Sequence, residues 1–276
     1  MQGFRTVEIV KDPAVPVFHI YLNRPAHRNA LTLDSFSELP RALTLLDQDP
    51  SARAVVLAAR GPHFCTGIDL SVLRSLGSAA AAGGSDPARA REHLRRQILS
   101  LQAAITAIER CRKPVIAAVH GACVGGGVDI VTACDLRYCT ADAFFSVKEV
   151  DVGLAADVGT LQRLPAIVGY GNASEMALTG RSVPAAEARA MGLVSAVFET
   201  REEMEKGVAA VARDVAAKSP LAVTGTKAVL LRCRDLTVDQ GLDYVATWNS
   251  AMLISDDLKE AVEAQIQKRK PTFAKL

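Results

Sequence analysis

The segment from Gly121 to Asp129 combines three consecutive glycines with a carboxylic acid, between two apolar runs. This pattern predicts a strand, a tight turn and the start of a helix, where unpaired backbone N–H groups and the helix dipole favour a negative charge. The segment lacks the Gly-Lys-Ser/Thr ending of a P-loop and the spacing of a dinucleotide-binding turn, and Asp129 would repel a phosphate. An oxyanion formed during proton transfer is therefore the favoured ligand. In the alternative interpretation, the glycines only let a helix pack closely against a strand.

A second turn, from Phe64 to Leu70, follows another expected strand and also contains a glycine. Backbone N–H groups around Gly67-Ile68 and Gly125-Gly126 lie on separate turns, and they could converge on one carbonyl oxygen. Removing one such donor typically costs about 3 kcal/mol of transition-state stabilisation. A thioester carbonyl is a natural ligand, because its enolate needs this support.

Strands and helices alternate along the rest of the first 200 residues, which is typical of an α/β fold. From Arg201 to about Arg269 the pattern is purely helical, so we expect a core over residues 1–200 and a helical region over 201–276. The run from Gly77 to Ala90, rich in Ala, Gly and Ser, is the best candidate for a mobile surface segment. The expected strands are Val7–Val10, Val15–Leu22, Ala54–Ala59, Pro114–Val119, Leu136–Cys139, Phe144–Ser146 and Val194–Phe198. The expected helices are Leu33–Asp47 with a break or kink at Pro40, Arg91–Arg112, and others that start near Asp157, Ala173 and Pro184.

Composition limits the function classes. The 276 residues are 49% hydrophobic and 22% charged, which is typical of a globular protein with a large core. A net charge of +2, scattered Lys and Arg residues and only 5% aromatic residues argue against nucleic acid as a main partner. No uncharged apolar run reaches the ~18 residues of a membrane span, and the N-terminus has no signal-peptide or transit-peptide character.

Cysteine usage and the C-terminus indicate a compartment. The six cysteines include no Cys-x-x-Cys pair and mostly lie in apolar runs, so we expect buried free thiols, a reducing compartment and no zinc site. The chain ends in Ala274-Lys275-Leu276, one small-residue change from the Ser-Lys-Leu peroxisomal signal. We therefore expect a peroxisomal import receptor as a partner. A mitochondrial location is less favoured, and dual targeting stays open.

Several separate segments resemble the crotonase family, the enoyl-CoA hydratase/isomerase superfamily. The turns from Phe64 to Asp69 and from Gly121 to Asp129 are similar to the two oxyanion-hole segments of that family. Leu22-Asn23-Arg24-Pro25 and Asn29-Ala30-Leu31 resemble its N-terminal motif. The segments occur in the right order, so the resemblance is specific and covers essentially the whole chain.

The resemblance implies a fold, an assembly and a substrate class. The fold is a spiral of ββα units followed by a C-terminal helical trimerisation region, usually in a hexamer made of two trimers. The substrates are acyl-CoA thioesters, which react through enolate intermediates without a metal or a redox cofactor, so coenzyme A is part of the substrate. Carried over by residue, the oxyanion donors are the N–H groups of Ile68 and Gly126.

Three acids narrow the resemblance to one branch. Hydratases carry a Glu two residues after the triple Gly, a Glu twenty residues later and a small residue eight positions beyond, where this chain has Asp129, Glu149 and Asp157. This set is similar to that of the branch that converts 3,5-dienoyl-CoA to 2,4-dienoyl-CoA in fatty acid β-oxidation. That reaction removes a proton from C2 and adds one at C6, which are too far apart for one short carboxyl group. Two proton carriers are therefore needed.

We assign Glu149 as the base at C2 and Asp157 as the acid at C6, although these two roles could be reversed. Asp129 would tune their pKa values or orient Glu149, and apolar surroundings should raise the carboxyl pKa values. Each acid also has a structural alternative. Asp157 could be a helix N-cap, Asp129 a first-turn acid that complements the helix dipole, and Glu149 a surface ion pair with Lys148.

Other polar residues receive structural or weaker interpretations. Coenzyme A contacts are expected at Arg28 and Ala30, in the loop after the second strand, and at Phe273 in the tail. Hydratase or Δ3-Δ2-enoyl-CoA isomerase activity on the same fold is the second hypothesis, and a non-enzymatic RNA-binding or scaffold role is the third. The residues interpreted as structural are Asp69, Asp151, the pair of Asp135 with Arg137, and His63 and His120 as satisfied polar contacts.

Overall fold

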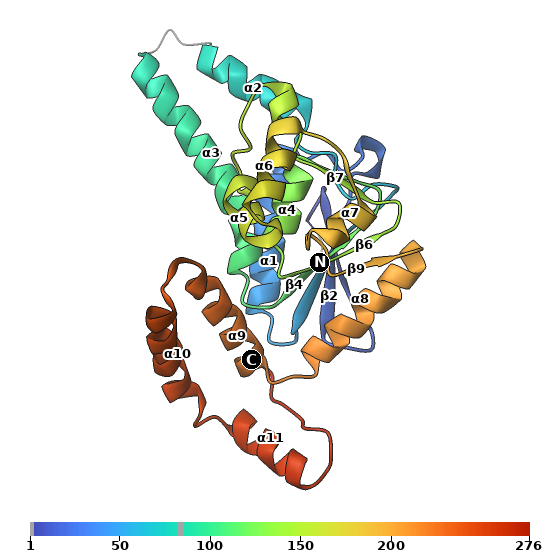
Figure 1. The fold of residues 1–276 in the computed structure, drawn as a ribbon, viewed down its shortest axis with the longest axis vertical. Helices are drawn as coiled ribbons and strands as arrows, with labels where there is room; N and C mark the ends of the chain where they lie inside the picture. Colours follow the sequence, from blue (N-terminus) through green and yellow to red (C-terminus); the bar gives the residue numbers. More distant parts are fainter. Residues whose placement is uncertain (1–2, 82–85) are drawn as a thin grey trace.

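A six-stranded sheet forms the centre of the protein in a computed structural model, which describes residues 3–81 and 86–276 (Figure 1). The strand order is β1-β2-β3-β4-β6-β9; the β1–β2 pair is antiparallel and the other neighbours are parallel. Strands β3 and β4 are buried along their whole length, because helices cover both faces of the sheet. The strands are β1 (Val7–Lys11), β2 (Val17–Leu22), β3 (Ala54–Ala59), β4 (Val115–Val119), β6 (Leu136–Thr140) and β9 (Ala196–Phe198).

A smaller sheet lies beside the first and carries one of the two glycine turns. Its strands are β5 (Ala122–Val124), β7 (Phe144–Ser146) and β8 (Val183–Pro184), in the order β5-β7-β8. A parallel bridge between Cys65 and Cys123 joins the other glycine turn to β5. The two turns, which are distant in sequence, are therefore held next to each other.

Alternate residues of the central strands enter two different hydrophobic cores. Val55 and Leu57 of β3 belong to a large core with most of the helices, whereas Val56 and Ala58 pack with the helix α8. The large core takes side chains from helices that are spread over residues 33–190. These helices are α1 (Leu33–Gln48), α3 (Pro87–Arg110), α4 (Gly126–Ala133), α5 (Thr160–Val168), α6 (Tyr170–Thr179) and α7 (Ala185–Ala190), and α2 (Leu70–Ala81) lies against α3.

The purely helical region begins at α8 (Arg201–Ala216), as the sequence predicts, but α8 itself covers the sheet. Its buried residues recur every four positions, from Met204 to Ala216. An arm that extends away from the core follows, made of α9 (Pro220–Arg232), α10 (Val238–Met252) and α11 (Asp256–Ile266) (Figure 1). We call these three helices the arm. Large apolar side chains such as Leu230, Ile254 and Ile266 are exposed on it.

Most predicted elements are confirmed within a few residues, and the structure corrects two details, the break at Pro40 and the start of the helix expected from Arg91. Pro40 lies inside a continuous α1 rather than ending it. The expected mobile segment, Gly77 to Ala90, overlaps the end of α2 and the start of α3, and residues 82–85 lie outside the described residues. The helix expected from Arg91 begins at Pro87, with the Asp86 carboxylate as its N-cap.

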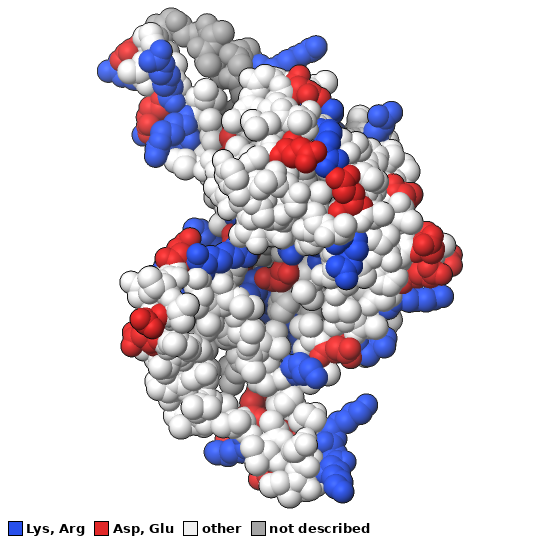
Figure 2. Space-filling view, in the orientation of Figure 1, with Lys and Arg blue, Asp and Glu red and all other residues white. Residues whose placement is uncertain are grey.

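The surface and the thiols agree with the composition. Positive and negative side chains are interspersed on the face shown in Figure 2. Five of the six cysteines are buried and Cys233 is partly buried, and all are free thiols, as predicted. In the described part of the chain, no helix has both the length and the apolar character needed to cross a membrane.

Candidate active site

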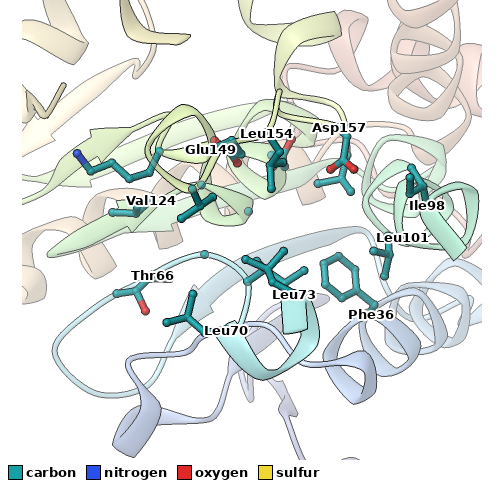
Figure 3. A pocket seen from close by; sticks show the side chains of 18 of the residues that line it. Phe36, Thr66, Leu70, Leu73, Ile98, Leu101, Val124, Glu149, Leu154 and Asp157 are labelled. Atoms are coloured by element: carbon teal, nitrogen blue, oxygen red, sulfur yellow. The ribbon is translucent and has the colours of Figure 1, made fainter. Parts of the chain in front are cut away.

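One pocket of about 360 Å³ brings together both glycine turns and all three candidate acids (Figure 3). Gly67-Ile68 and Gly125-Gly126 lie on its lining, with Asp129, Glu149 and Asp157. Apolar side chains complete the lining; Figure 3 shows Phe36, Leu70 and Leu73 opposite the two labelled acids, and Ile98 and Leu101 of α3 at the end nearest Asp157. A pocket that is largely apolar with a few convergent polar groups is the usual form of a small-molecule site.

Hydrogen bonds from the N-terminal segment hold the first turn in place. Asn29 is buried in the left-handed conformation, and its side-chain amide donates to the carbonyls of Arg60 and His63. Leu31 N–H donates to Gly67 O over 2.8 Å, and Asp69 N–H donates to the Leu31 carbonyl. These contacts fix the backbone on both sides of Ile68.

The second turn needs glycine for conformational reasons and for close packing. Gly125 has φ = +51°, and its N–H donates to Ser146 O of β7 over 2.8 Å. A Cβ on Gly126 would lie 3.0 Å from Leu31 Cδ1 and 3.8 Å from Ile68 N. The N–H groups of Ile68 and Gly126 are therefore neighbours, and among the described residues neither donates to a protein acceptor. They are free to bind a ligand oxygen.

Asp129 is fully buried in the first turn of α4. Its Oδ1 accepts hydrogen bonds from the backbone N–H and the hydroxyl of Thr160, over 2.6 and 2.7 Å. Its Oδ2 is buried and has no hydrogen-bond partner in the described part of the chain. Burial raises the pKa of Asp129 to about 6, although the two hydrogen bonds from Thr160 oppose this shift.

Glu149 is the first residue of a short 3₁₀ helix, η2 (Glu149–Val152), and lies next to the second turn. A Cβ on Gly125 would come within 3.3 Å of Glu149 Oε1, and Oε2 is buried without a partner among the described residues. Burial raises the pKa of Glu149 to about 7, with a further contribution from the nearby charge of Asp129. The alternative ion pair with Lys148 is wrong, because Lys148 Nζ instead lies 2.6 Å from the Asp151 carboxylate.

Asp157 lies in the loop before α5 and is also on the pocket wall. Asp157 is partly exposed to solvent, and its partial burial raises its pKa. Its backbone carbonyl accepts a hydrogen bond from Gln102 of α3 over 2.7 Å. The N-cap of α5 is Gly159, which has no side-chain cap, so Asp157 is not the helix cap that the sequence alternative proposed. The carboxylate that binds the first N–H of α5 belongs to Asp129.

This arrangement suits proton transfer beside a stabilised oxyanion. Two N–H donors can stabilise the negative charge that develops on a carbonyl oxygen. Carboxyl groups with raised pKa values can exchange protons near neutral pH. Among the described residues, no group of three or more His, Cys, Asp and Glu side chains is arranged to hold a metal ion.

The residues expected to bind coenzyme A do not line this pocket. Arg28 and Ala30 flank Asn29, and the Arg28 carbonyl accepts a hydrogen bond from Thr66 N–H over 3.2 Å. The Phe273 carbonyl accepts a hydrogen bond from Arg53 over 2.7 Å, which holds the tail against the core. The coenzyme A contacts therefore stay a prediction.

Among the structural interpretations, one is wrong and the others hold. Asp135 does not pair with Arg137; its carboxylate accepts hydrogen bonds from Lys227 Nζ and Val115 N–H, over 2.6 and 2.7 Å. Arg137 donates instead to the backbone carbonyls of Cys134 and Leu193. The contacts of the remaining residues are Asp69 with Ser71, Asp151 with Lys148, His63 with Ala122 N–H, and His120 with the Gly61 carbonyl.

Comparison with known proteins places this chain in a family. The profile described as enoyl-CoA hydratase/isomerase matches residues 14–275. The chain is 61% identical to the protein named Delta(3,5)-Delta(2,4)-dienoyl-CoA isomerase, peroxisomal, of Arabidopsis thaliana, over 100% of this chain and 99% of the relative. It is 48% identical to the human protein named Delta(3,5)-Delta(2,4)-dienoyl-CoA isomerase, mitochondrial, over 94% of this chain and 80% of the relative.

Solved structures agree on the fold. An enoyl-CoA hydratase from Bacillus anthracis superposes with a TM-score of 0.87 at 27% identity, covering 98% of this chain and 99% of that one. An enoyl-CoA hydratase from Mycobacterium smegmatis gives a TM-score of 0.84 at 31% identity, covering 97% and 98%. The predicted crotonase fold is thus confirmed, and the chain belongs to the enoyl-CoA hydratase/isomerase family.

Proposed function

We propose that this protein is a Δ3,5-Δ2,4-dienoyl-CoA isomerase that acts in fatty acid β-oxidation. The observation that carries the proposal is the position of Asp157, a third acid in the pocket that holds Glu149 and both oxyanion donors. Full-length relatives at 61% and 48% identity that bear this enzyme name support it. A longer acid relay is what separates this reaction from hydration at adjacent carbons.

The proposed reaction begins with binding of the thioester carbonyl oxygen by the N–H groups of Ile68 and Gly126. The Glu149 carboxylate removes a proton from C2, and the electron pair delocalises over the thioester and the conjugated chain as an extended trienolate. Protonated Asp157 then gives its proton to C6, so the 3,5-diene becomes a 2,4-diene. Glu149 ends protonated and Asp157 ionised, and transfer of one proton between them, directly or through solvent, restores the starting state.

The pKa directions support these roles. A base at C2 is effective when its pKa lies near the working pH, and burial with the Asp129 charge raises the pKa of Glu149 to about 7. An acid must hold a proton for part of the cycle, and burial raises the pKa of Asp157 from its usual value. Proton transfer and oxyanion stabilisation account for the reaction, so we propose no metal or redox cofactor.

The proposal includes a location and an assembly. The Arabidopsis relative is named peroxisomal, whereas the human one is named mitochondrial. The terminal Ala274-Lys275-Leu276 supports import into peroxisomes through a receptor that binds this tripeptide. The exposed apolar side chains of the arm support homo-oligomerisation, with the family's trimer, or a hexamer of two trimers, as the proposed state.

The experiment follows the appearance of a conjugated 2,4-dienoyl thioester by ultraviolet absorbance after a 3,5-dienoyl-CoA is added. Wild type and Asp157→Asn are compared, and the hydration of a 2-enoyl-CoA is measured in parallel. We expect turnover by wild type and a loss of roughly 100-fold or more in kcat for Asp157→Asn, because the C6 acid is removed.

Three other outcomes would change the assignment. Hydration of 2-enoyl-CoA without dienoyl isomerisation would replace the isomerase proposal with the hydratase alternative. Unchanged isomerisation by Asp157→Asn would keep the activity but remove Asp157 from the relay. A non-enzymatic scaffold role would instead predict no turnover of either substrate.

A further inference from the structure

Thr160, at the start of α5, is a fully buried residue that has no part in the proposed chemical steps. Its backbone N–H and its hydroxyl both donate to the same oxygen, Asp129 Oδ1, over 2.6 and 2.7 Å. The two residues belong to different helices and are 31 positions apart in sequence. Two donors on one carboxylate oxygen favour the ionised form and fix its orientation.

The second oxygen of Asp129 is left without a partner. Oδ2 is buried and accepts no hydrogen bond in the described part of the chain, and Glu149 Oε2 is in the same condition. Both side chains line the same pocket. A buried carboxylate that is held through one oxygen keeps its charge close to the other acid, because it can neither rotate away nor be neutralised by a cation.

We propose that Thr160 is a positioning residue, which holds Asp129 ionised and in one orientation so that its charge keeps Glu149 a strong base. The inference rests on the proposed isomerase function, because Glu149 is the proposed base at C2. It adds a residue outside the acid set to the machinery. Thr160 acts only through Asp129.

No charged group around Asp129 contacts its carboxylate in the described part of the chain, so Thr160 is the residue that keeps it ionised. Asp157, in the loop before α5, raises the pKa of Asp129, whereas Arg163 of α5 lowers it. Arg163 is occupied elsewhere, since its guanidinium lies 2.9 Å from the Glu109 carboxylate of α3 in a largely buried ion pair. The hydrogen bonds from Thr160 oppose the effect of burial more strongly than the charge of Arg163 does.

Neutral thiols and a paired lysine complete the surroundings. Burial raises the pKa of the Cys65 and Cys123 thiols, so both stay uncharged at neutral pH beside Asp129. Lys148 lines the pocket, but its Nζ lies 2.6 Å from the Asp151 carboxylate. The ionised form of Asp129 therefore depends on hydrogen bonds rather than on a contacting cation.

The test measures kcat/KM against pH with a 3,5-dienoyl-CoA for wild type, Thr160→Val, Thr160→Ser and a control, Thr132→Val. Thr132 is equally buried, and its hydroxyl donates to the backbone carbonyl of Asp129 over 3.1 Å rather than to the carboxylate. In Thr160→Val, Asp129 takes up a proton at higher pH, and Glu149 loses a neighbouring charge. We expect the acid limb of the kcat/KM profile to move down by about one pH unit, because Glu149 becomes a weaker base that stays ionised at lower pH. The plateau value of kcat/KM should also fall, because a weaker base removes the C2 proton more slowly.

The remaining variants separate positioning from packing. Thr160→Ser should restore the wild-type limb, and Thr132→Val should keep it. An unmoved limb in folded Thr160→Val, or an equal shift in Thr132→Val, would overturn the inference. In an Asp129→Asn background, Thr160→Val should cause no further shift, and a further shift would show that Thr160 does not act through Asp129.

Failure of the proposed function has a different signature. A wild type that does not turn over 3,5-dienoyl-CoA would contradict the isomerase proposal itself. An infrared titration of the carboxyl groups, without substrate, reads the Glu149 pKa in every variant. A lower Glu149 pKa in Thr160→Val alone supports the positioning role in either case, and an unchanged value contradicts it.

Discussion

Two regions of this protein bury carboxylates, and they treat them differently. In the pocket, Asp129 and Glu149 each keep one buried oxygen without a partner among the described residues, and no cation contacts them. At the start of strands β4 and β6, the carboxylate of Asp135 is contacted by Lys227 Nζ and by Val115 N–H. Burial raises the carboxyl pKa values in both regions. In the pocket they reach about 6 and about 7, whereas at Asp135 the charge and hydrogen bond of Lys227 and the hydrogen bond from Val115 oppose the shift and tie α9 to strand β4.

The difference separates chemistry from structure. A buried charge without a counterion is costly, so such groups stay only where their raised pKa is used. A buried acid that is paired with a cation and accepts a hydrogen bond from an amide contributes to the stability of the fold. Removing one partner leaves the other as an uncompensated buried charge, which destabilises the folded state. Replacing acids in the two regions should therefore have opposite consequences for activity and stability.

The largest effect is expected for Glu149→Gln. Removing the base should lower kcat on 3,5-dienoyl-CoA by roughly 1,000-fold, within the range for general acid–base catalysis. The thermal midpoint should stay unchanged or rise, because a neutral amide replaces an unpaired buried acid. Ultraviolet turnover and thermal unfolding by circular dichroism measure the two quantities.

Asp151→Asn is the matched control for Glu149→Gln. Asp151 lies two residues further along in the same short helix, and its side chain is 47% exposed in a surface ion pair with Lys148. Loss of such a pair changes stability little, and it should leave kcat near the wild-type value. Comparable turnover for Glu149→Gln and Asp151→Asn would refute the difference between paired and unpaired acids.

Asp135→Asn is expected to act on stability instead. Lys227 has only 6% of its side chain exposed, so it would keep a buried charge without its counterion. We expect a loss of about 3 kcal/mol in the free energy of unfolding, measured by urea titration, with kcat per folded molecule unchanged. Adding Lys227→Met should recover part of the loss, since it removes the uncompensated charge. A stable Asp135→Asn protein would mean that this pair does not hold α9 to the sheet.

These residues also show how far sequence reasoning reached. The two turns are predicted from their glycine-rich local patterns, whereas the set of three acids is predicted from the resemblance to the crotonase family. The pairing of Asp135 was predicted wrongly because a nearby residue, Arg137, looked like a partner, whereas Lys227 is 92 residues away. The contact of Thr160 with Asp129 was missed for the same reason, although a hydroxyl residue directly after Gly159 at a helix start was a usable signal.

The fold shows the same limit. Apolar runs located nearly every strand, because burial and β-branched side chains leave a local pattern. The same patterns do not distinguish α8, which packs on the sheet, from α9 to α11, which extend away from it. Both α8 and the arm helices alternate apolar and polar residues along their length. Which face an amphipathic helix meets depends on contacts that are distant in sequence.

The smallest expected effect is a pH dependence of stability that belongs to the pocket acids. The pKa of Glu149 is about 7 in the folded state against 4.5 ordinarily, so the folded protein holds this proton more tightly than the unfolded chain. The stabilisation from that proton is fully present below pH 4.5 and is lost as the pH rises through about 7. In Glu149→Gln this contribution is absent, so the stability of the variant relative to wild type should increase with pH.

Urea unfolding of both proteins at several pH values between 5 and 8 measures this change. We expect the difference in unfolding free energy to move by about 1 kcal/mol in favour of the variant, a small value because the pocket is open to solvent and screens the charge. A pH-independent difference for Glu149→Gln would mean that Glu149 titrates alike in the folded and unfolded states. The pocket would then lack the unpaired, desolvated acid that distinguishes it from the region around Asp135.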